Sequence, residues 1–198
     1  NIFKARVKKQ FQDEKKLNEF IAQSLSFGDQ HDATVQLQNS FINSKLHPVG
    51  YKYKIYSLND GTNYSQIVHP QIHGHYYDFL KRYDFYDVFI IEKDNLDIVY
   101  SVFKETDFAT SLKSGPYSNT KLAQVANQIV DDYRLDSFRE PQVYFTDFER
   151  YAPSYFAPAA FVAAPIFNKD KVFQGVLAVQ IKPDNLNKVL ANNYQWNK

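Results

Sequence analysis

The stretch YDVFIIEKDNLDIVYSVFKETDFATSLKSGPY, residues 86–117, decides the fold because it carries the clearest sheet signal in the chain. Two runs rich in β-branched and aromatic residues, DVFII at 87–91 and IVYSVF at 98–103, flank the polar segment EKDNLD. Asp94 and Asn95 in that segment are turn formers, so the pattern predicts an antiparallel hairpin.

The apolar run stops after Phe103, and the chain continues as KETDFATSLKSGPY. This segment is polar, yet it contains Phe108, Leu112 and Tyr117, and a Gly-Pro pair stands near its end. A loop of this length that has apolar residues of its own normally packs against something. We therefore expect residues 104–117 to lie across one face of the sheet and to close a small-molecule site.

The part of the chain before the hairpin is mainly helical in pattern. Apolar residues recur at helical intervals from residue 2 to about residue 25, which predicts a long amphipathic helix. A second helical stretch begins at about residue 32 and stops before His47-Pro48, because the residue before proline avoids the helical region. The run YKYKIYSL within residues 50–64 predicts an exposed strand or an ordered loop. His69-Pro70 then opens a helix with proline at its first position.

One helix and three strands follow the covering segment. Ser118 or Asn119 is placed to cap a helix that carries an apolar stripe of Leu122, Val125, Ala126, Ile129, Val130 and Tyr133. The predicted strands are VYFTDF at 143–148, AAFVAAPIF at 159–167 and VFQGVLAVQIKP at 172–183. Asp184 is placed to cap a last helix.

This order of elements predicts an α+β fold, a five-stranded antiparallel sheet with helices packed on it. The strands are apolar on both sides, as Phe161 and Val162 show in adjacent positions. We therefore expect both faces of the sheet to be covered, one by the long N-terminal helix and the other by the loop and helix of residues 104–133.

Composition excludes several classes of function. The 198 residues carry 23 basic and 22 acidic side chains, a formal net charge of +1, which argues against a nucleic-acid partner because such a partner needs a concentrated basic face. There is no cysteine, so disulfides, thiolate catalysis and thiolate metal sites are excluded. No apolar run approaches the roughly 18 residues of a membrane span, and the chain opens directly in a helical pattern, so we expect a fragment of a longer protein.

Small residues beside large ones predict a ligand pocket above the sheet. Alanine at positions 157, 159, 160, 163 and 164 leaves room there. The predicted lining is Tyr100, Tyr117, Tyr144, Tyr151, Tyr155, Ala159 and Phe161. The alternative is that the alanines simply admit close packing of a helix.

Asp147, near the end of the strand VYFTDF, is the polar group that we expect to anchor a ligand. A carboxylate among tyrosine rings suits an amine or ammonium group, through charge-assisted hydrogen bonds and cation–π contacts. A turn or capping role is the alternative for Asp147. Arg150 is placed to bind a carboxylate instead, although an exposed arginine is the commoner outcome.

Neither a metal site nor a catalytic site is indicated. His69, His73 and His75 lie in HPQIHGH, but His73 and His75 point to different sides of a helix and no carboxylate completes the set. The charges of KETD at residues 104–107 have no nucleophile arrangement nearby, and adjacent loop charges are usually solvated or paired with each other. We expect no metal, no cofactor and no enzymatic activity.

Residues 76–190 resemble the extracytoplasmic Cache-type, PAS-like sensor domains of bacterial membrane receptors such as methyl-accepting chemotaxis proteins. The motifs that carry the resemblance occur in the same order: IVYSVFKE, a D-F loop, GPY before a helix, then DFERYAPS, PAAFVAAP and GVLA. The resemblance implies a PAS-like sheet in a sensor domain at residues 67–198, preceded at residues 1–66 by a helical region with an ordered loop or strand.

The resemblance also implies a function and a place. The chain would be the periplasmic part of an inner-membrane receptor, flanked by two transmembrane helices, and would bind a small polar molecule, an amine or amino-acid-like compound, between the sheet and residues 104–117. The output domain stays open among a chemotaxis signalling domain, a kinase and a nucleotide cyclase. The alternative is a structural module that senses nothing and whose N-terminal helix pairs two receptor copies as a homodimer.

Overall fold

The computed structural model describes residues 30–48, 50–135 and 143–184, so the long helix predicted at residues 2–25 and the last predicted helix beyond Asp184 lie outside it. The elements are α3 (Gln30–Phe41), the short helices η1 (Lys52–Lys54) and η2 (Tyr64–Val68), α4 (His69–Tyr83), β1 (Asp87–Glu92), β2 (Ile98–Ser101), α5 (Lys121–Arg134), β3 (Tyr144–Phe145), β4 (Glu149–Tyr151), β5 (Ala157–Phe167) and β6 (Phe173–Ile181). The second and third predicted helices are confirmed as α3 and α4, although α3 ends earlier than expected. Residues 50–64 form η1 and an ordered loop.

The strands form an antiparallel sheet in the order β2-β1-β6-β5-β3, with β4 also paired to β5. This confirms the predicted α+β fold with a PAS-like antiparallel sheet. The third predicted strand, at 143–148, is divided into β3 and β4. Thr146 causes the break, because its Oγ1 accepts the Phe161 N–H at 2.9 Å in the place of a backbone carbonyl.

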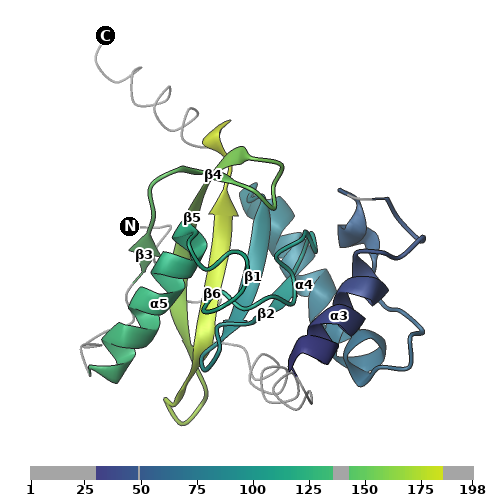
Figure 1. Ribbon diagram of the computed structural model, residues 1–198, viewed down its shortest axis with the longest axis horizontal. Coiled ribbons are helices and arrows are strands. Elements are labelled where there is room, and N and C mark those ends of the chain that lie inside the picture. The colour runs from purple at the N-terminus through teal and green to yellow at the C-terminus, as the bar shows by residue number, and fades with distance from the viewer. Residues whose placement is uncertain (1–29, 49, 136–142, 185–198) are drawn as a thin grey trace.

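Both faces of the sheet are covered, as predicted. Val88 and Ile90 of β1 belong to one apolar cluster, and Phe89 and Ile91, which point to the opposite face, belong to another. Figure 1 shows α5 on one side of the sheet and α4 and α3 on the other. We call these the α5 face and the α4 face. Among the described residues, α3 and α4 cover the face that was predicted for the N-terminal helix.

Residues before position 67 share the core of the α4 face. Leu37, Phe41 and Tyr64 pack in the same cluster as Tyr100 of β2. The division of the chain at residues 66 and 67 stays a prediction. Among the described residues, no helix has both the length and the apolar character that crossing a bilayer requires.

Helix α5 carries the predicted stripe, but its cap is neither Ser118 nor Asn119, the two predicted positions. Thr120 is the cap, since its side chain accepts the Ala123 N–H at 3.2 Å. The stripe residues are buried, namely Leu122, Val125, Ala126, Ile129 and Val130, whereas Tyr133 is exposed.

Residues 104–117 do not lie across one face of the sheet, and that prediction is wrong. Part of the segment runs along the edge strand β2: Ala109 N–H donates to Ile98 O at 3.0 Å, Ile98 N–H to Thr110 O at 2.9 Å and Leu112 N–H to Leu96 O at 2.8 Å. An edge strand has backbone groups that need partners, and this segment supplies them. Its apolar side chains therefore divide between the faces, with Phe108 on the α4 face and Leu112 on the α5 face.

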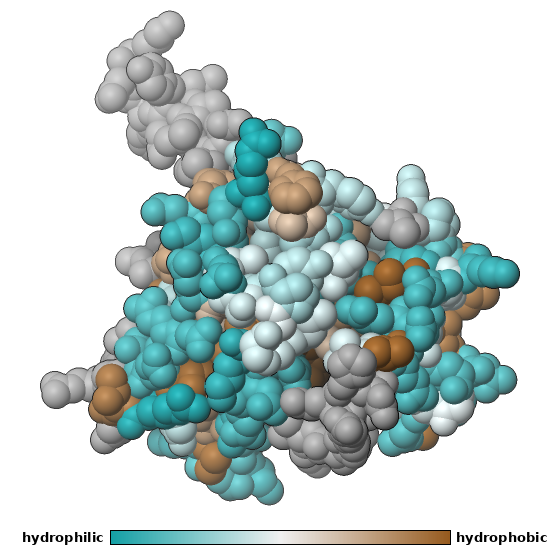
Figure 2. Space-filling view, in the orientation of Figure 1, coloured by the Kyte–Doolittle hydropathy of each residue, from teal (hydrophilic) through white to brown (hydrophobic). Residues whose placement is uncertain are grey.

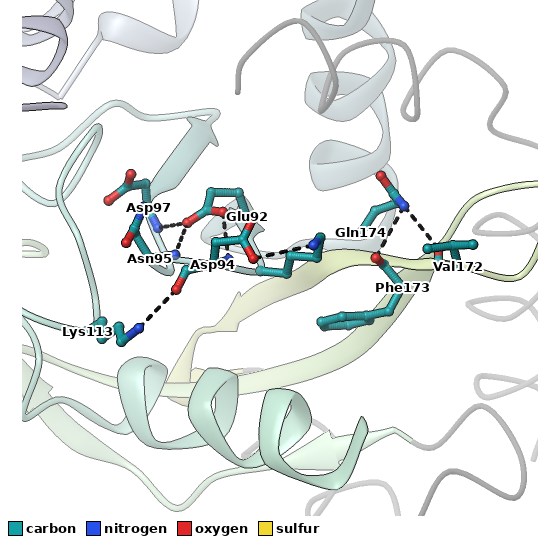
Figure 3. Close-up of polar contacts among 9 residues, drawn as sticks. Glu92, Asp94, Asn95, Asp97, Lys113, Val172, Phe173 and Gln174 are labelled. Carbon is teal, nitrogen blue, oxygen red and sulfur yellow. Dashed lines mark hydrogen bonds and ion pairs between the residues drawn. The ribbon is translucent and has the colours of Figure 1, made fainter. Parts of the chain in front are cut away.

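The turn between β1 and β2 is organised by a buried carboxylate. Glu92 accepts the backbone N–H groups of Asp94 at 2.7 Å, Asn95 at 2.5 Å and Asp97 at 3.2 Å, as Figure 3 shows. Glu92 in turn pairs with Gly175 of β6. A glycine is required at that position because a Cβ atom would overlap the carbonyl oxygen of Ile91.

Replacing Gly175 by alanine tests this close approach. The atom in the way belongs to the backbone of β1, so relief of the overlap must distort the β1–β6 ladder. We expect Gly175→Ala to lower the free energy of unfolding by about 1–3 kcal/mol in urea titrations. Gly74→Ala is the matched control, because a Cβ there meets only Tyr56 Cε1 at 3.6 Å and alanine favours the helix. Unchanged stability in Gly175→Ala would contradict the prediction.

Candidate functional site

Asp87, the first residue of β1, closes the end of the hairpin. Its Oδ1 accepts the backbone N–H groups of Val88 at 2.7 Å, Val102 at 2.9 Å and Phe103 at 3.2 Å, and its Oδ2 accepts Ser101 Oγ–H at 2.7 Å. Asp87 is fully buried, so these donors replace the water that would otherwise solvate the carboxylate. The chain beyond β2 is thereby drawn over the end of the sheet.

The next residues enter the interior. Lys104, Glu105 and Asp107 are buried, and Thr106 between them is exposed. The backbone turns at Lys104 with φ 53°, a left-handed conformation that is uncommon for residues with a side chain. Phe108 then fixes the far end of the turn in the α4-face cluster. The expectation that these charges are solvated or paired with each other is therefore wrong.

Glu105 and Asp107 connect this segment to distant parts of the sheet through hydroxyl groups. Glu105 Oε1 accepts Tyr86 Oη–H at 2.7 Å, and Oε2 accepts Ser154 Oγ–H at 2.8 Å. Ser154 lies in the β4–β5 connection and also contacts Gln180 of β6, whose Nε2 donates to it at 3.0 Å. Asp107 Oδ2 accepts Tyr151 Oη–H at 2.5 Å. Partners more than 40 positions away thus hold the segment against the sheet.

Burial favours the uncharged form of Asp87, Lys104, Glu105 and Asp107 and shifts their pKa values accordingly. Burial, reinforced by neighbouring carboxylates, raises the pKa of Glu105 to about 8 and that of Asp107 to about 7. Burial also raises the pKa of Asp87 to about 6, against the effect of its four hydrogen bonds. The pKa of Lys104 is lowered by burial to about 7, and the Asp87 charge opposes this shift. The cluster therefore changes its charge in the neutral range.

Lys104 points to the α4 face. Its Nζ donates to the Val102 carbonyl oxygen at 3.0 Å and lies 5.6 Å from the centre of the Phe41 ring and 5.8 Å from that of Tyr100. Rings at these distances stabilise an ammonium group by cation–π attraction.

His69 and His73 of α4 hold the loop that precedes η2. His69 Nδ1 lies 2.9 Å from the Tyr56 carbonyl oxygen and His73 Nε2 lies 2.7 Å from that of Tyr53, so both nitrogens carry a hydrogen and donate. Burial lowers the pKa of His73 to about 3, which keeps it neutral. His75 is exposed. No group of three or more potential metal ligands occurs among the described residues.

Helix α3 forms hydrogen bonds with the backbone of residues 104–110. Gln38 Nε2 donates to the carbonyl oxygens of Thr106 at 3.2 Å and Phe108 at 2.9 Å, and Thr34 Oγ1–H donates to that of Ala109 at 2.6 Å. Phe41 packs edge-on against Phe108 with ring centres 5.6 Å apart. Residues 104–110 therefore contact both the sheet and α3.

Most of the predicted pocket lining gathers on the α5 face. Tyr144, Tyr151, Ala159 and Phe161 are buried in one cluster there, and Tyr117 packs against it. Tyr100 lies on the α4 face with its hydroxyl group 2.8 Å from His73 Nδ1. The rings on the α5 face pack on each other, since the centres of Tyr151 and Phe161 are 5.1 Å apart.

The remaining predicted site residues lie on the surface. Asp147 and Arg150 are exposed, and so is Tyr155, which is 65% exposed in the β4–β5 connection. On the face seen in Figure 2, hydrophilic and weakly polar side chains predominate and the hydrophobic ones form separate spots. The buried carboxylates were the residues whose role the sequence analysis missed. The available signal was that KETD lies between Phe103 and Phe108, so the segment begins and ends in apolar surroundings.

Comparisons with known proteins give likenesses in structure and none in sequence. No family model matches the chain, and no curated protein matches it. The sensor domain of the histidine kinase DctB from V. cholerae aligns over 92% of this chain and 58% of its own, with a TM-score of 0.40 and 13% identity. An extracellular ligand binding receptor from Desulfohalobium retbaense aligns over 86% of this chain and 26% of its own, with a TM-score of 0.31 and 13% identity. The chain thus spans less than two thirds of either structure.

The role of Asp87 can be tested by removing its carboxylate. Asp87→Ala removes the carboxylate acceptor of the Val88, Val102 and Phe103 N–H groups, of which Val102 N–H keeps a second acceptor, Val88 O at 3.3 Å. Each buried group left unsatisfied costs about 1–3 kcal/mol. We expect the free energy of unfolding to fall by about 2–4 kcal/mol, with a smaller loss in Asp87→Asn because the amide oxygen still accepts. Asp78→Ala, on the exposed side of α4, should change it by less than about 0.5 kcal/mol. Equal effects at the two positions would refute this role.

Proposed function

We propose that this domain is an extracytoplasmic sensor of a membrane receptor that binds a small polar molecule, an amine or amino-acid-like compound, and has no enzymatic activity. The ligand lies on the α5 face, between the sheet and the part of residues 104–117 that contains Asp107. The observation that carries this proposal is Asp107, a buried carboxyl group that joins residues 104–117 to Tyr151 of the predicted lining. An ammonium group is the natural partner for such a carboxylate.

The packing of the α5 face defines how a ligand enters. Tyr151 and Phe161 are fully buried and in mutual contact, so binding requires residues 104–117 to move away from β4 and β5. Because α3 holds this segment through Gln38 and Thr34, such a movement reaches α3. A ligand shifts the arrangement only by binding one form more tightly than the other.

A thermal-shift screen of amino acids, amines and carboxylates tests the proposal. A compound at a hundred times its dissociation constant should stabilise the domain by about 2.7 kcal/mol, which raises the melting temperature by roughly 5–10 °C. We expect amine-bearing compounds to act and carboxylates without an amine to have no effect.

Two variants identify the anchor. Asp107→Asn should abolish the shift, whereas Asp147→Asn, which replaces an exposed carboxylate by the same amide, should retain it. The opposite result would assign the anchor to Asp147, as the sequence predicted. If no compound raises the melting temperature of the wild type, the mutual packing of Tyr151 and Phe161 favours a structural module, and sedimentation should then show a dimer.

A further inference from the structure

Within the part of the chain that the structure describes, no ion pair balances the charges of residues 104–107. Asp87, Glu105 and Asp107 are buried carboxyl groups, and the buried cation beside them, Lys104, donates to a carbonyl oxygen. In the described part of the chain, the carboxyl groups of Glu105 and Asp107 accept hydrogen bonds from the side-chain hydroxyl groups of Tyr86, Ser154 and Tyr151 and from no cation. A buried carboxylate without a cationic partner is strongly disfavoured, and the usual remedy is the uptake of a proton.

The partners decide which carboxyl groups can hold that proton. Asp87 Oδ1 accepts three backbone N–H groups, which cannot accept in return, so its surroundings favour the ionised form. The carboxyl groups of Glu105 and Asp107 accept from the hydroxyl groups of Tyr86, Ser154 and Tyr151, which can both donate and accept. Burial raises the pKa of Asp107 and outweighs the opposing effect of the nearby backbone N–H groups of Asp107 and Phe108. When Glu105 is protonated, its Oε2–H donates to Ser154, whose hydroxyl also lies 3.3 Å from Gln180 Oε1. The bond to Ser154 is therefore kept with its direction reversed, and Tyr86 still donates to Oε1.

An unpartnered atom points to the same conclusion. Asp107 is 0% exposed, and within the described residues its Oδ1 has no hydrogen-bond partner. A charged oxygen in that position is very unfavourable, whereas a neutral carbonyl oxygen is tolerated at much lower cost. A proton on Oδ2, donated to Tyr151 Oη, leaves Oδ1 in that neutral form.

We propose that Glu105 and Asp107 form a buried proton-binding site, so that the domain responds to the proton concentration around it. Residues 104–110 stay fixed to the sheet while both carboxyl groups are protonated, and they loosen when these groups release their protons to solvent. The loosening reaches α3 through Gln38 and Thr34. This role goes beyond small-molecule binding and stands if that function fails.

Other titratable groups face the site from each element around it. On the described elements they are Asp87 of β1, Tyr86 directly before β1, Lys104 on the segment itself and Tyr151 of β4. Tyr100 of β2 and His69 and His73 of α4 face Lys104. The tyrosine pKa values are raised by burial and the histidine values are lowered by it, so neither kind changes charge between pH about 5 and 8. Asp87 and Lys104 do change charge there, which is why the test must compare variants.

The direction of the pH effect follows from the shifts. Burial raises the pKa of Glu105 to about 8 and of Asp107 to about 7, above the value of about 4 in the unfolded chain. The folded state therefore binds more protons, and this contribution to stability is complete below pH about 4 and is lost as the pH rises to about 8. Between these limits the folding equilibrium constant falls by up to about tenfold per pH unit for each group.

The experiment compares melting temperature against pH, from about 5 to 8.5, for the wild type and for Glu105→Gln, Asp107→Asn and the double variant. The amides mimic the protonated carboxyl groups, so we expect a fall with pH in the wild type that is reduced in each single variant and smallest in the double variant. Asp147→Asn, at an exposed carboxylate, should follow the wild type. Parallel curves for the wild type and the double variant would overturn the proposal.

A second measurement covers variants that fail to fold. Carbon-13 NMR of the side-chain carboxyl groups of the wild type should give titration midpoints above pH about 6 for Glu105 and Asp107. Midpoints near 4 would refute the site. Amide hydrogen exchange at residues 108–112 should also be faster in the wild type than in the double variant at pH 8, and the comparison at one pH cancels the intrinsic rate. Equal exchange would show that the protons do not hold the segment.

Discussion

The structure depends on the carboxylate of Asp87. This one side chain accepts the N–H groups of Val102 and Phe103 and so fixes where β2 ends and in which direction the chain leaves it. Burial of the polar residues that follow is costly, and these two hydrogen bonds direct the chain into the interior despite that cost. The carboxylate thus determines that Lys104, Glu105 and Asp107 lie inside the protein.

Residues 104–110 connect the β4–β5 region of the sheet to helix α3. Their side chains reach Tyr151, the last residue of β4, and Ser154 in the β4–β5 connection, and their carbonyl oxygens accept from Thr34 and Gln38 of α3. Side-chain contacts respond to charge, whereas the carbonyl contacts do not. In the proposed proton site, a change of charge at the carboxyl groups would weaken the contacts to the sheet and leave the hydrogen bonds to α3 intact, so that residues 104–110 and α3 would move together.

The fold was predictable because its signals are local. The hairpin, the stripe of α5 and the strands β5 and β6 each follow from periodicity within a few residues. The site was not, because its partners are distant: the burial of KETD depends on Tyr151 and Ser154, more than 40 positions away. The sequence prediction placed Tyr100 and Phe161 in the wall of one pocket, whereas the structure places them on opposite faces of the sheet. Deciding between these arrangements requires the strand register across β1, β6 and β5. Tyr100 pairs with Ile90, and both belong to the α4 face.

The two proposed roles share Asp107, and this constrains both. If an ammonium group occupies the carboxylate, the proton that the carboxyl group holds in the free domain must leave, so the two ligands compete for one group. Linkage then requires that protons weaken the binding of the cation and that the cation lowers proton affinity by the same factor. Glu105, bound to Tyr86 and Ser154, is not part of the proposed cation site, so it would keep its proton when a cation binds to Asp107. The domain therefore distinguishes a cation, which acts at one carboxyl group, from a rise in pH, which acts at both.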